Sequence, residues 1–265
     1  MDYQTIILEK GDGIATITLN RPQKRNAFNS QLLDEFIKAK EDAAADPGVK
    51  VLIITGAGSA FCAGNDFSVG ETPSQVVMPE TMRMRQAIAS QEKQMFDLRK
   101  IPKPVIAMVN GPAIGAGLGF FLSCDMAVAS EDAVFGFGFV RLGLHPEVGI
   151  TYILPRIAGM AKACELIFLG KTIDAKEAER IGLVNLVVSR DKLVSTTREL
   201  ALSLVKGPSV AIGLAKISLY QSWDEGLRSA LENEARANAI CVTTEDFKEA
   251  VKAFREKRPP VFQGK

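Results

Sequence analysis

The alternation of apolar and polar residues predicts a hairpin and then a helix at the start of the chain. Two β-rich runs within residues 5–20 flank a Gly-Asp-Gly sequence, which supplies a tight turn. Over residues 29–48 the apolar positions recur with a period of 3.6, which predicts a helix capped by Asn29. Pro47 and Gly48 are expected to end this helix.

Further along, buried strands and helices are expected to alternate. Continuous apolar runs at 49–56 and 103–111 are typical of strands that are covered on both faces. Helices are predicted at 79–100 and after the glycines near residue 115, and a third strand at 126–130. Strands that alternate with helices favour an α/β fold with parallel pairing.

After about residue 150 the pattern becomes nearly all helical. Asp174 and Glu177 have the spacing of a capping box at the start of one of these helices. We therefore expect an α/β core over residues 1–200 and a helical C-terminal region over residues 201–265.

Composition excludes several function classes. The chain has 265 residues, 47% of them hydrophobic, with 32 Lys+Arg against 31 Asp+Glu, so no basic excess points to nucleic acid. The four cysteines form no CxxC pair, and one histidine is too few for a common zinc site. No apolar run reaches about 18 residues, and the start of the chain has no signal-peptide pattern. We expect a cytoplasmic protein without a membrane or nucleic-acid partner and without a metal.

Two strands are followed by glycine-rich loops, which raises the question of nucleotide binding. "GAGSAF" at 56–61 and "GAGLGF" at 115–120 both end in phenylalanine where the dinucleotide fingerprint requires glycine. Such loops also let a ligand approach main-chain N–H groups closely, as an oxyanion hole requires. Tight strand-to-helix packing is the other interpretation, and the loops alone do not decide between the two.

Four segments carry a resemblance to a known family. They are "FCAGNDF" (61–67), "PVIAMVNGPAIGAGLGFFLSCDMAVAS" (104–130), "LGLHPEVGITYILPRIAG" (142–159) and "AERIGLVN" (178–185). Their order and spacing are similar to those of the enoyl-CoA hydratase/isomerase, or crotonase, superfamily. The resemblance implies an α/β fold, a spiral of ββα units with a C-terminal helical trimerisation region. It also implies a homotrimer or a dimer of trimers.

The resemblance also implies the substrate and the residues that bind it. The substrate would be an acyl-CoA thioester, so coenzyme A is part of the substrate and no separate cofactor is expected. The main-chain N–H groups of Asn65 and Ala116 would hold the thioester oxygen. The matching positions for substrate binding are Lys24, Arg25, Ala27, Ala63, Asp66 and Phe67, with Phe254 and Lys257 contributed by a neighbouring helical tail.

The reaction depends on the carboxylates near the acyl group. Hydratases of this family use two glutamates, and the matching positions here hold Gly119 and Phe139. Glu147 lies where isomerases of the peroxisomal Δ3,Δ2-enoyl-CoA type place a single acidic residue. The resemblance therefore implies that a 3-enoyl-CoA is converted to a 2-enoyl-CoA, with Glu147 as both base and acid.

Other interpretations of the same residues stay open. Glu147 follows a proline, as an acidic residue in the first turn of a helix would. The protein could instead hydrate or hydrolyse an enoyl- or cyclic dienoyl-CoA, or bind acyl-CoA without chemistry. His145, Cys62 and the phenylalanines at 120–139 are interpreted first as structural residues.

Overall fold

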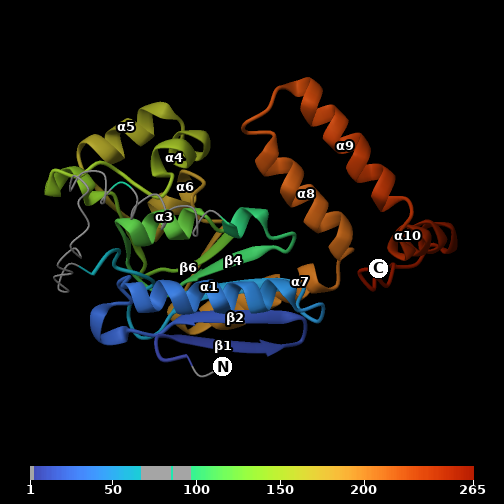
Figure 1. Ribbon diagram of the computed structural model, residues 1–265, viewed down its shortest axis with the longest axis horizontal. Helices are drawn as coiled ribbons and strands as arrows, with labels where there is room; N and C mark the ends of the chain where they lie inside the picture. The colour runs from blue at the N-terminus through green and yellow to red at the C-terminus, as the bar shows by residue number, and fades with distance from the viewer. Residues whose placement is uncertain (1–2, 67–84, 86–96) are drawn as a thin grey trace, which may run out of the picture.

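The computed structural model describes residues 3–66, 85 and 97–265 and is built on a six-stranded sheet of order β1-β2-β3-β4-β6-β9 (Figure 1). The first two strands pair antiparallel, and every later neighbour in the sheet pairs parallel. The predicted hairpin and parallel core are therefore confirmed. The strands are β1 (Ile6–Gly11), β2 (Ile14–Leu19), β3 (Val51–Gly56), β4 (Val105–Val109), β6 (Met126–Ser130) and β9 (Leu186–Val188).

A smaller three-stranded sheet lies beside the first, in the order β5-β7-β8. It consists of β5 (Ala113–Ile114), β7 (Val134–Gly136) and β8 (Thr172–Asp174). β5 runs parallel to β7, and β8 runs antiparallel to it. The short strands β8 and β9 lie in the part of the chain that the sequence pattern predicts as nearly all helical, so that prediction is incomplete.

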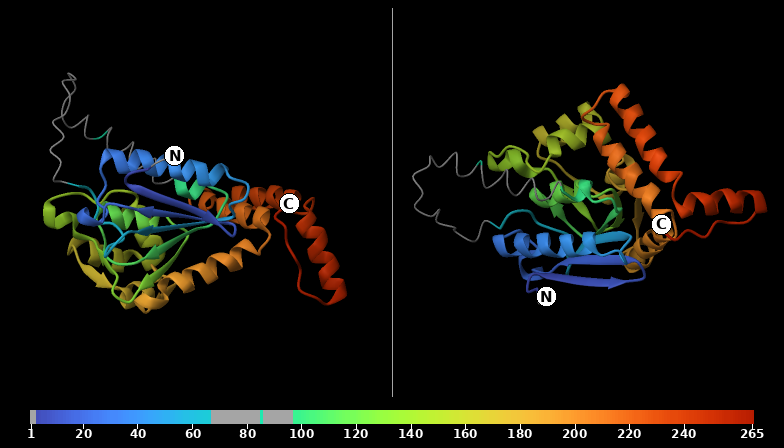
Figure 2. Two further views of the ribbon diagram at one scale, coloured as in Figure 1. Left: turned by 90° about the horizontal axis from the view of Figure 1, so that it is seen from below. Right: turned by 45° about the vertical axis from the view of Figure 1, so that its right-hand side comes forward.

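Helices cover both faces of the large sheet, which explains its continuous apolar strands. Leu52 and Ile54 of β3 join a core cluster with α1, whereas Val51 and Ile53 face Ala201 of α7 (Figure 2). Successive side chains of a strand point to opposite faces, so a strand covered twice needs apolar residues throughout. The helices are α1 (Ser30–Ala45), α3 (Ala116–Leu122), α4 (Ile150–Ala158), α5 (Met160–Phe168), α6 (Ala175–Arg180), α7 (Leu193–Val205), α8 (Ser209–Gln221), α9 (Leu227–Cys241) and α10 (Glu245–Glu256).

The predicted helix caps are present. Asn29 Oδ1 accepts a hydrogen bond of 2.9 Å from the N–H of Leu32 at the start of α1. Asp174 Oδ1 accepts one of 2.8 Å from the N–H of Glu177 at the start of α6. These bonds satisfy N–H groups that have no acceptor within the helix. Most of the helix predicted at 79–100 lies outside the described residues, and its last residues form a short 3-10 turn at Asp97–Lys100.

The last three helices extend from the core as an arm (Figures 1 and 2). The buried Lys216 of α8 anchors this arm, because its Nζ donates to the carbonyls of Leu98 and Lys103 at 2.8 and 2.9 Å and pairs with Asp125 at 2.8 Å. Burial lowers the pKa of Lys216, and the Asp125 carboxylate opposes that shift. α7 spans residue 200, so the boundary predicted there falls inside a helix that packs on the sheet. The division into two regions stays a prediction.

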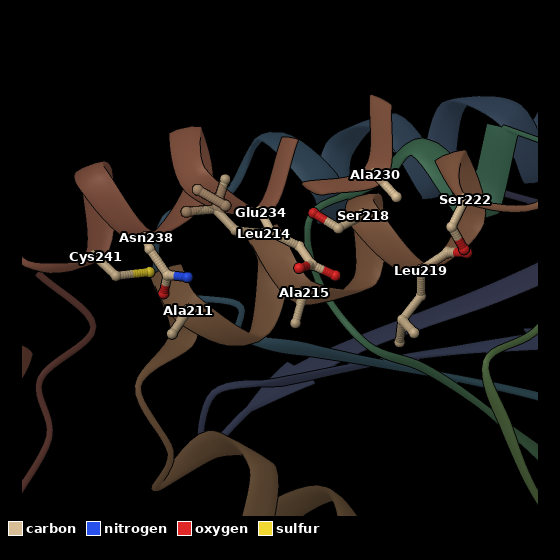
Figure 3. Close-up of a pocket in the computed structure, with 11 residues that line it drawn as sticks. Ala211, Leu214, Ala215, Ser218, Leu219, Ser222, Ala230, Glu234, Asn238 and Cys241 are labelled. Atoms are coloured by element: carbon tan, nitrogen blue, oxygen red, sulfur yellow. The ribbon is translucent and has the colours of Figure 1, made fainter. Parts of the chain in front are cut away.

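The surface of the arm has a groove between two of its helices. This groove of about 330 Å³ lies between α8 and α9. Figure 3 shows the side chains that line it, most of which are small or polar. No single helix among the described residues is long and apolar enough to cross a membrane. Residues Arg190–Val205 and Ser209–Gln221 pass that test of length and composition only as a pair bent by 104°.

Candidate active site

Two chain segments that follow neighbouring parallel strands lie side by side and form the floor of the candidate site. The segment after β3 and the segment after β4 are joined by hydrogen bonds from Cys62 N to Pro112 O (3.1 Å) and from Ile114 N to Cys62 O (3.0 Å). Ligands of α/β proteins commonly bind at the carboxyl ends of parallel strands. The arrangement brings Asn65 and Ala116 to the same end of the sheet.

The main-chain N–H of Asn65 is oriented by the pairing of its neighbours. Phe28 donates its N–H to Gly64 O at 2.7 Å and accepts from the N–H of Asp66 at 2.9 Å, and Asn65 forms a parallel bridge with it. Along an extended strand the N–H groups alternate sides. The N–H of Asn65 therefore points away from Phe28.

Ala116 is the first residue of α3, so helix geometry gives its N–H no acceptor within the helix. Gly64, at φ +91°, is so close that a Cβ there would lie 3.2 Å from Ala116 N and 2.9 Å from Ile114 O. A Cβ on Gly117 would lie 2.3 Å from Cys62 O. Glycine at both positions lets the two segments that carry Asn65 and Ala116 approach closely.

Glu147 faces this floor from the turn before α4. Its Oε1 accepts a hydrogen bond of 2.9 Å from the side-chain amide of Asn65, and both residues are half-buried. α4 begins at Ile150 with Gly149 as its N-cap, so Glu147 lies before the helix and not in its first turn. The helix-start interpretation of Glu147 is therefore wrong.

The residue after Glu147 has an unusual conformation. Val148 has φ +55° and its side chain is 1% exposed. A β-branched residue in the left-handed region is strained by about 1–3 kcal/mol and persists only where the surroundings hold it. Such strain is concentrated at functional sites, which supports a functional role for this turn.

The two positions that lack the hydratase glutamates are filled by packing. A Cβ on Gly119 would lie 2.5 Å from Val148 Cβ, and Phe139 is 6% exposed with its Cζ 3.9 Å from a Cβ built on Gly115. At the two positions where the family resemblance places the hydratase glutamates, this chain therefore has an apolar ring, at Phe139, and no side chain, at Gly119.

Comparisons with known proteins agree with this geometry. The model of the family described as enoyl-CoA hydratase/isomerase matches residues 9–265. The chain belongs to this family. It is 39% identical to a short-chain-enoyl-CoA hydratase of Clostridium acetobutylicum over 97% of both chains. It is 35% identical to a 1,2-epoxyphenylacetyl-CoA isomerase of Escherichia coli over the full length of both. The crystal structure of an enoyl-CoA hydratase from Bacillus anthracis superposes with a TM-score of 0.90 at 32% identity, covering 99% of this chain and 100% of that one. The chain is thus an enzyme of the enoyl-CoA hydratase/isomerase family with the crotonase fold.

Some of the residues that the family resemblance assigns to substrate binding lie next to the floor of the site. Ala63 donates its N–H to Arg25 O at 3.0 Å, which joins the "QKRNAF" segment to the loop after β3. Lys24 and Arg25 are exposed, whereas Ala27 is 7% exposed. The exposed cations of Lys24 and Arg25 can pair with a phosphate group, whereas the buried methyl group of Ala27 can only contribute to the shape of the site.

Asp66 has a structural partner. Its Oδ2 accepts from Arg21 Nη2 at 2.8 Å, and Arg21 Nη1 also donates to Ala27 O at 2.5 Å. Both side chains are largely buried, at 5% and 11% exposure. Asp66 therefore joins the loop after β3 to the segment of Arg21 and Ala27, the two segments that carry the predicted coenzyme-binding residues.

Phe254 and Lys257 are not brought to the site within one chain. Phe67 lies outside the described residues. Phe254, 86% exposed, and the exposed Lys257 lie on and just after α10, at the end of the arm away from α4 and α5 (Figures 1 and 2). Phe254 and Lys257 could contact the substrate only in the site of a second copy of this chain, as the family resemblance implies.

The residues interpreted as structural are mostly buried in the fold. The rings of Phe120, Phe135 and Phe137 are fully buried in the core. His145 is exposed on the turn before Glu147. The buried Asn26 was not predicted as important: its side chain donates to Ala57 O and Ala60 O at 2.9 and 2.8 Å and accepts from Arg21 N at 2.9 Å. Its position at φ +57° is typical of asparagine, but the sequence does not reveal such a turn.

Cys62 is expected to resist alkylation in the folded protein, although it adjoins the site. It is 0% exposed, and burial raises the pKa of its thiol to about 12. Because only the thiolate is nucleophilic, iodoacetamide at pH 8 should label the half-buried Cys164 and Cys241 but not Cys62. Mass spectrometry of native and urea-unfolded samples measures this, and labelling of native Cys62 as fast as of Cys164 would contradict the packing.

Proposed function

We propose that this protein is an enoyl-CoA isomerase that converts a 3-enoyl-CoA to a 2-enoyl-CoA through an enolate of the thioester. The observation that carries the proposal is the 2.9 Å hydrogen bond between Glu147 Oε1 and the side chain of Asn65. Asn65 also supplies one of the main-chain N–H groups of the proposed oxyanion hole. The only carboxylate assigned to the chemistry is thus tied to the residue that would bind the thioester oxygen.

The reaction requires one proton transfer in each direction. The N–H groups of Asn65 and Ala116 bind the thioester oxygen, and Glu147 removes a proton from C2. The electron pair of the broken C–H bond delocalises over C2, C3 and C4 and onto that oxygen, where the two N–H groups stabilise the negative charge. Glu147 then returns the proton to C4, which leaves a C2=C3 double bond. Atoms and charge balance without water.

A single carboxylate can perform both transfers because it is the acid in the second step after acting as the base in the first. The bond from Asn65 orients the carboxylate through one oxygen. Since C2 and C4 are on the same allylic unit, a fixed carboxylate above that unit can reach both carbons. The half-buried position limits exchange of the proton with solvent.

Hydration of a 2-enoyl-CoA is the second candidate, because several relatives are named as hydratases. Addition of water across C2=C3 requires groups that hold the water and deliver its proton. The family resemblance places those groups at the positions of Gly119 and Phe139, neither of which can act as an acid or base. This difference favours isomerisation over hydration, including hydration or hydrolysis of a cyclic or dienoyl-CoA.

A panel of 2-enoyl-, 3-enoyl- and dienoyl-CoA thioesters in H₂¹⁸O distinguishes the candidates. We expect the 3-enoyl-CoA to be converted to a product of unchanged mass with the absorbance of a conjugated thioester. A product heavier by one labelled water would support the hydratase. Binding of all thioesters without turnover, and without exchange of α-protons in D₂O, would mean a silent acyl-CoA binding protein.

The assembly and the other components follow as further proposals. A homotrimer or dimer of trimers would allow Phe254 and Lys257 of one copy to approach the coenzyme site of another. Lys24 and Arg25 would bind the coenzyme A phosphates. Coenzyme A enters as part of the substrate, and the proposed steps use no separate cofactor.

A further inference from the structure

The turn that carries the proposed base Glu147 is closely packed against α3. Val148 follows Glu147 in the chain, and its buried side chain occupies the place where a side chain on Gly119 of α3 would begin. A Cβ on Gly119 would lie 2.5 Å from Val148 Cβ, 3.0 Å from its Cγ1 and 3.0 Å from its carbonyl oxygen. The first of these distances is shorter than any real carbon–carbon contact between side chains.

Val148 has a backbone conformation that valine otherwise avoids. At φ +55° a valine is disfavoured, so the packing around it must fix the backbone. In the same turn, the side chain of Glu147 accepts the hydrogen bond from the side chain of Asn65. Val148 thus lies close to Gly119 of α3, and the Glu147 carboxylate is bonded to the loop after β3.

We propose that Gly119 is a positioning residue: because it has no side chain, the turn at Val148 can lie against α3 and direct the Glu147 carboxylate to the Asn65 side of the site. This inference rests on the proposed function for its link to catalysis, but its steric part does not. The pair Gly119 and Val148 acts as a unit: the absence of a side chain on one makes room for the other.

Substitution of each member alone and of both together tests the pair. Gly119→Ala forces a Cβ against Val148, so the turn must shift, and we expect kcat for a 3-enoyl-CoA to fall at least about tenfold with KM changed less than about threefold. Val148→Gly removes the opposing side chain and accepts the same backbone conformation. In the Val148→Gly background only the 3.0 Å approach to the residue 148 carbonyl oxygen remains, and a backbone shift of a few tenths of an ångström relieves it. The added Gly119→Ala change should therefore cost less than about threefold. Val148→Ala keeps the clashing Cβ and should not relieve the Gly119→Ala loss.

Gly138→Ala is the matched control, because a Cβ on Gly138 has no atom within 4 Å and should leave kcat unchanged. Thermal unfolding of each variant distinguishes a loss of stability from a misdirected Glu147 carboxylate. If the pair were purely structural, Gly119→Ala would lower the unfolding temperature without changing kcat at 25 °C. An equal kcat loss from Gly119→Ala in both backgrounds would overturn the proposal.

Crystal structures of Gly119→Ala and of the double variant decide the steric part without any turnover. The proposal expects the bond between Glu147 Oε1 and Asn65 Nδ2 to be broken in the single variant and restored in the double variant. An intact 2.9 Å bond in Gly119→Ala would refute it. If the unmodified protein converts no 3-enoyl-CoA, the proposed function fails, and these structures still decide whether the missing side chain of Gly119 sets the direction of Glu147.

Discussion

Glu147→Gln should lower kcat for 3-enoyl-CoA isomerisation by about 10²–10⁴-fold, which is the usual contribution of a general acid–base group. Glutamine has the same shape and keeps an oxygen that can accept the 2.9 Å hydrogen bond from Asn65. The geometry of the turn should therefore survive, while the ability to take a proton is lost. Because the main-chain N–H groups are unchanged, acyl-CoA should bind with nearly unchanged affinity.

Steady-state kinetics with a 3-enoyl-CoA and calorimetric titration with a saturated acyl-CoA measure the two effects separately. Glu131→Gln is a matched control, since Glu131 is exposed and follows β6. The control should retain full activity. Turnover of Glu147→Gln within tenfold of the unmodified protein would mean that another group moves the proton.

Ala116→Pro should lower kcat by about 10²–10³-fold, because it deletes one N–H donor of the proposed hole. Losing one such donor costs about 3 kcal/mol of transition-state stabilisation. Proline is tolerated at the first position of a helix, where its missing N–H has no acceptor in the helix. The substitution therefore removes the donor with little damage to α3, and its ring also occupies part of the space in front of the hole.

Glu245→Pro provides the comparison for this experiment. Glu245 is the exposed first residue of α10, and Thr244 Oγ1 can still accept the capping hydrogen bond from the N–H of Phe247 in this variant. The comparison variant should keep its activity and unfolding temperature. If Ala116→Pro folds normally and still isomerises the substrate at an unchanged rate, the thioester oxygen does not depend on the N–H of residue 116.

Local signals in the sequence predict much of the fold. The Asn29 cap, the 3.6 period after it and the apolar run of β6 each depend on neighbouring residues, and each is confirmed. Glycines 64 and 117 are next to the residues assigned to the hole, and close backbone contact explains why both lack a side chain. Such features are visible in a sequence because the physical cause is local.

The geometry around Glu147 could not be predicted in the same way. The bond from Asn65 joins residues 82 positions apart, and nothing near either residue indicates it. Val148 has a left-handed backbone without the glycine that usually marks one, and its close neighbour Gly119 of α3 is 29 positions away in the chain. Pro146 before Glu147 suggests a helix start, yet α4 begins at Ile150 with Gly149 as its N-cap.

The most direct test is a crystal structure of the Glu147→Gln variant with a 3-enoyl-CoA. The account predicts that the thioester oxygen lies within hydrogen-bond distance of the N–H groups of both Asn65 and Ala116. It also predicts that the residue 147 side chain lies next to C2 and C4 of the acyl group. A thioester oxygen bound elsewhere, or a residue 147 side chain directed into solvent and away from these carbons, would contradict it.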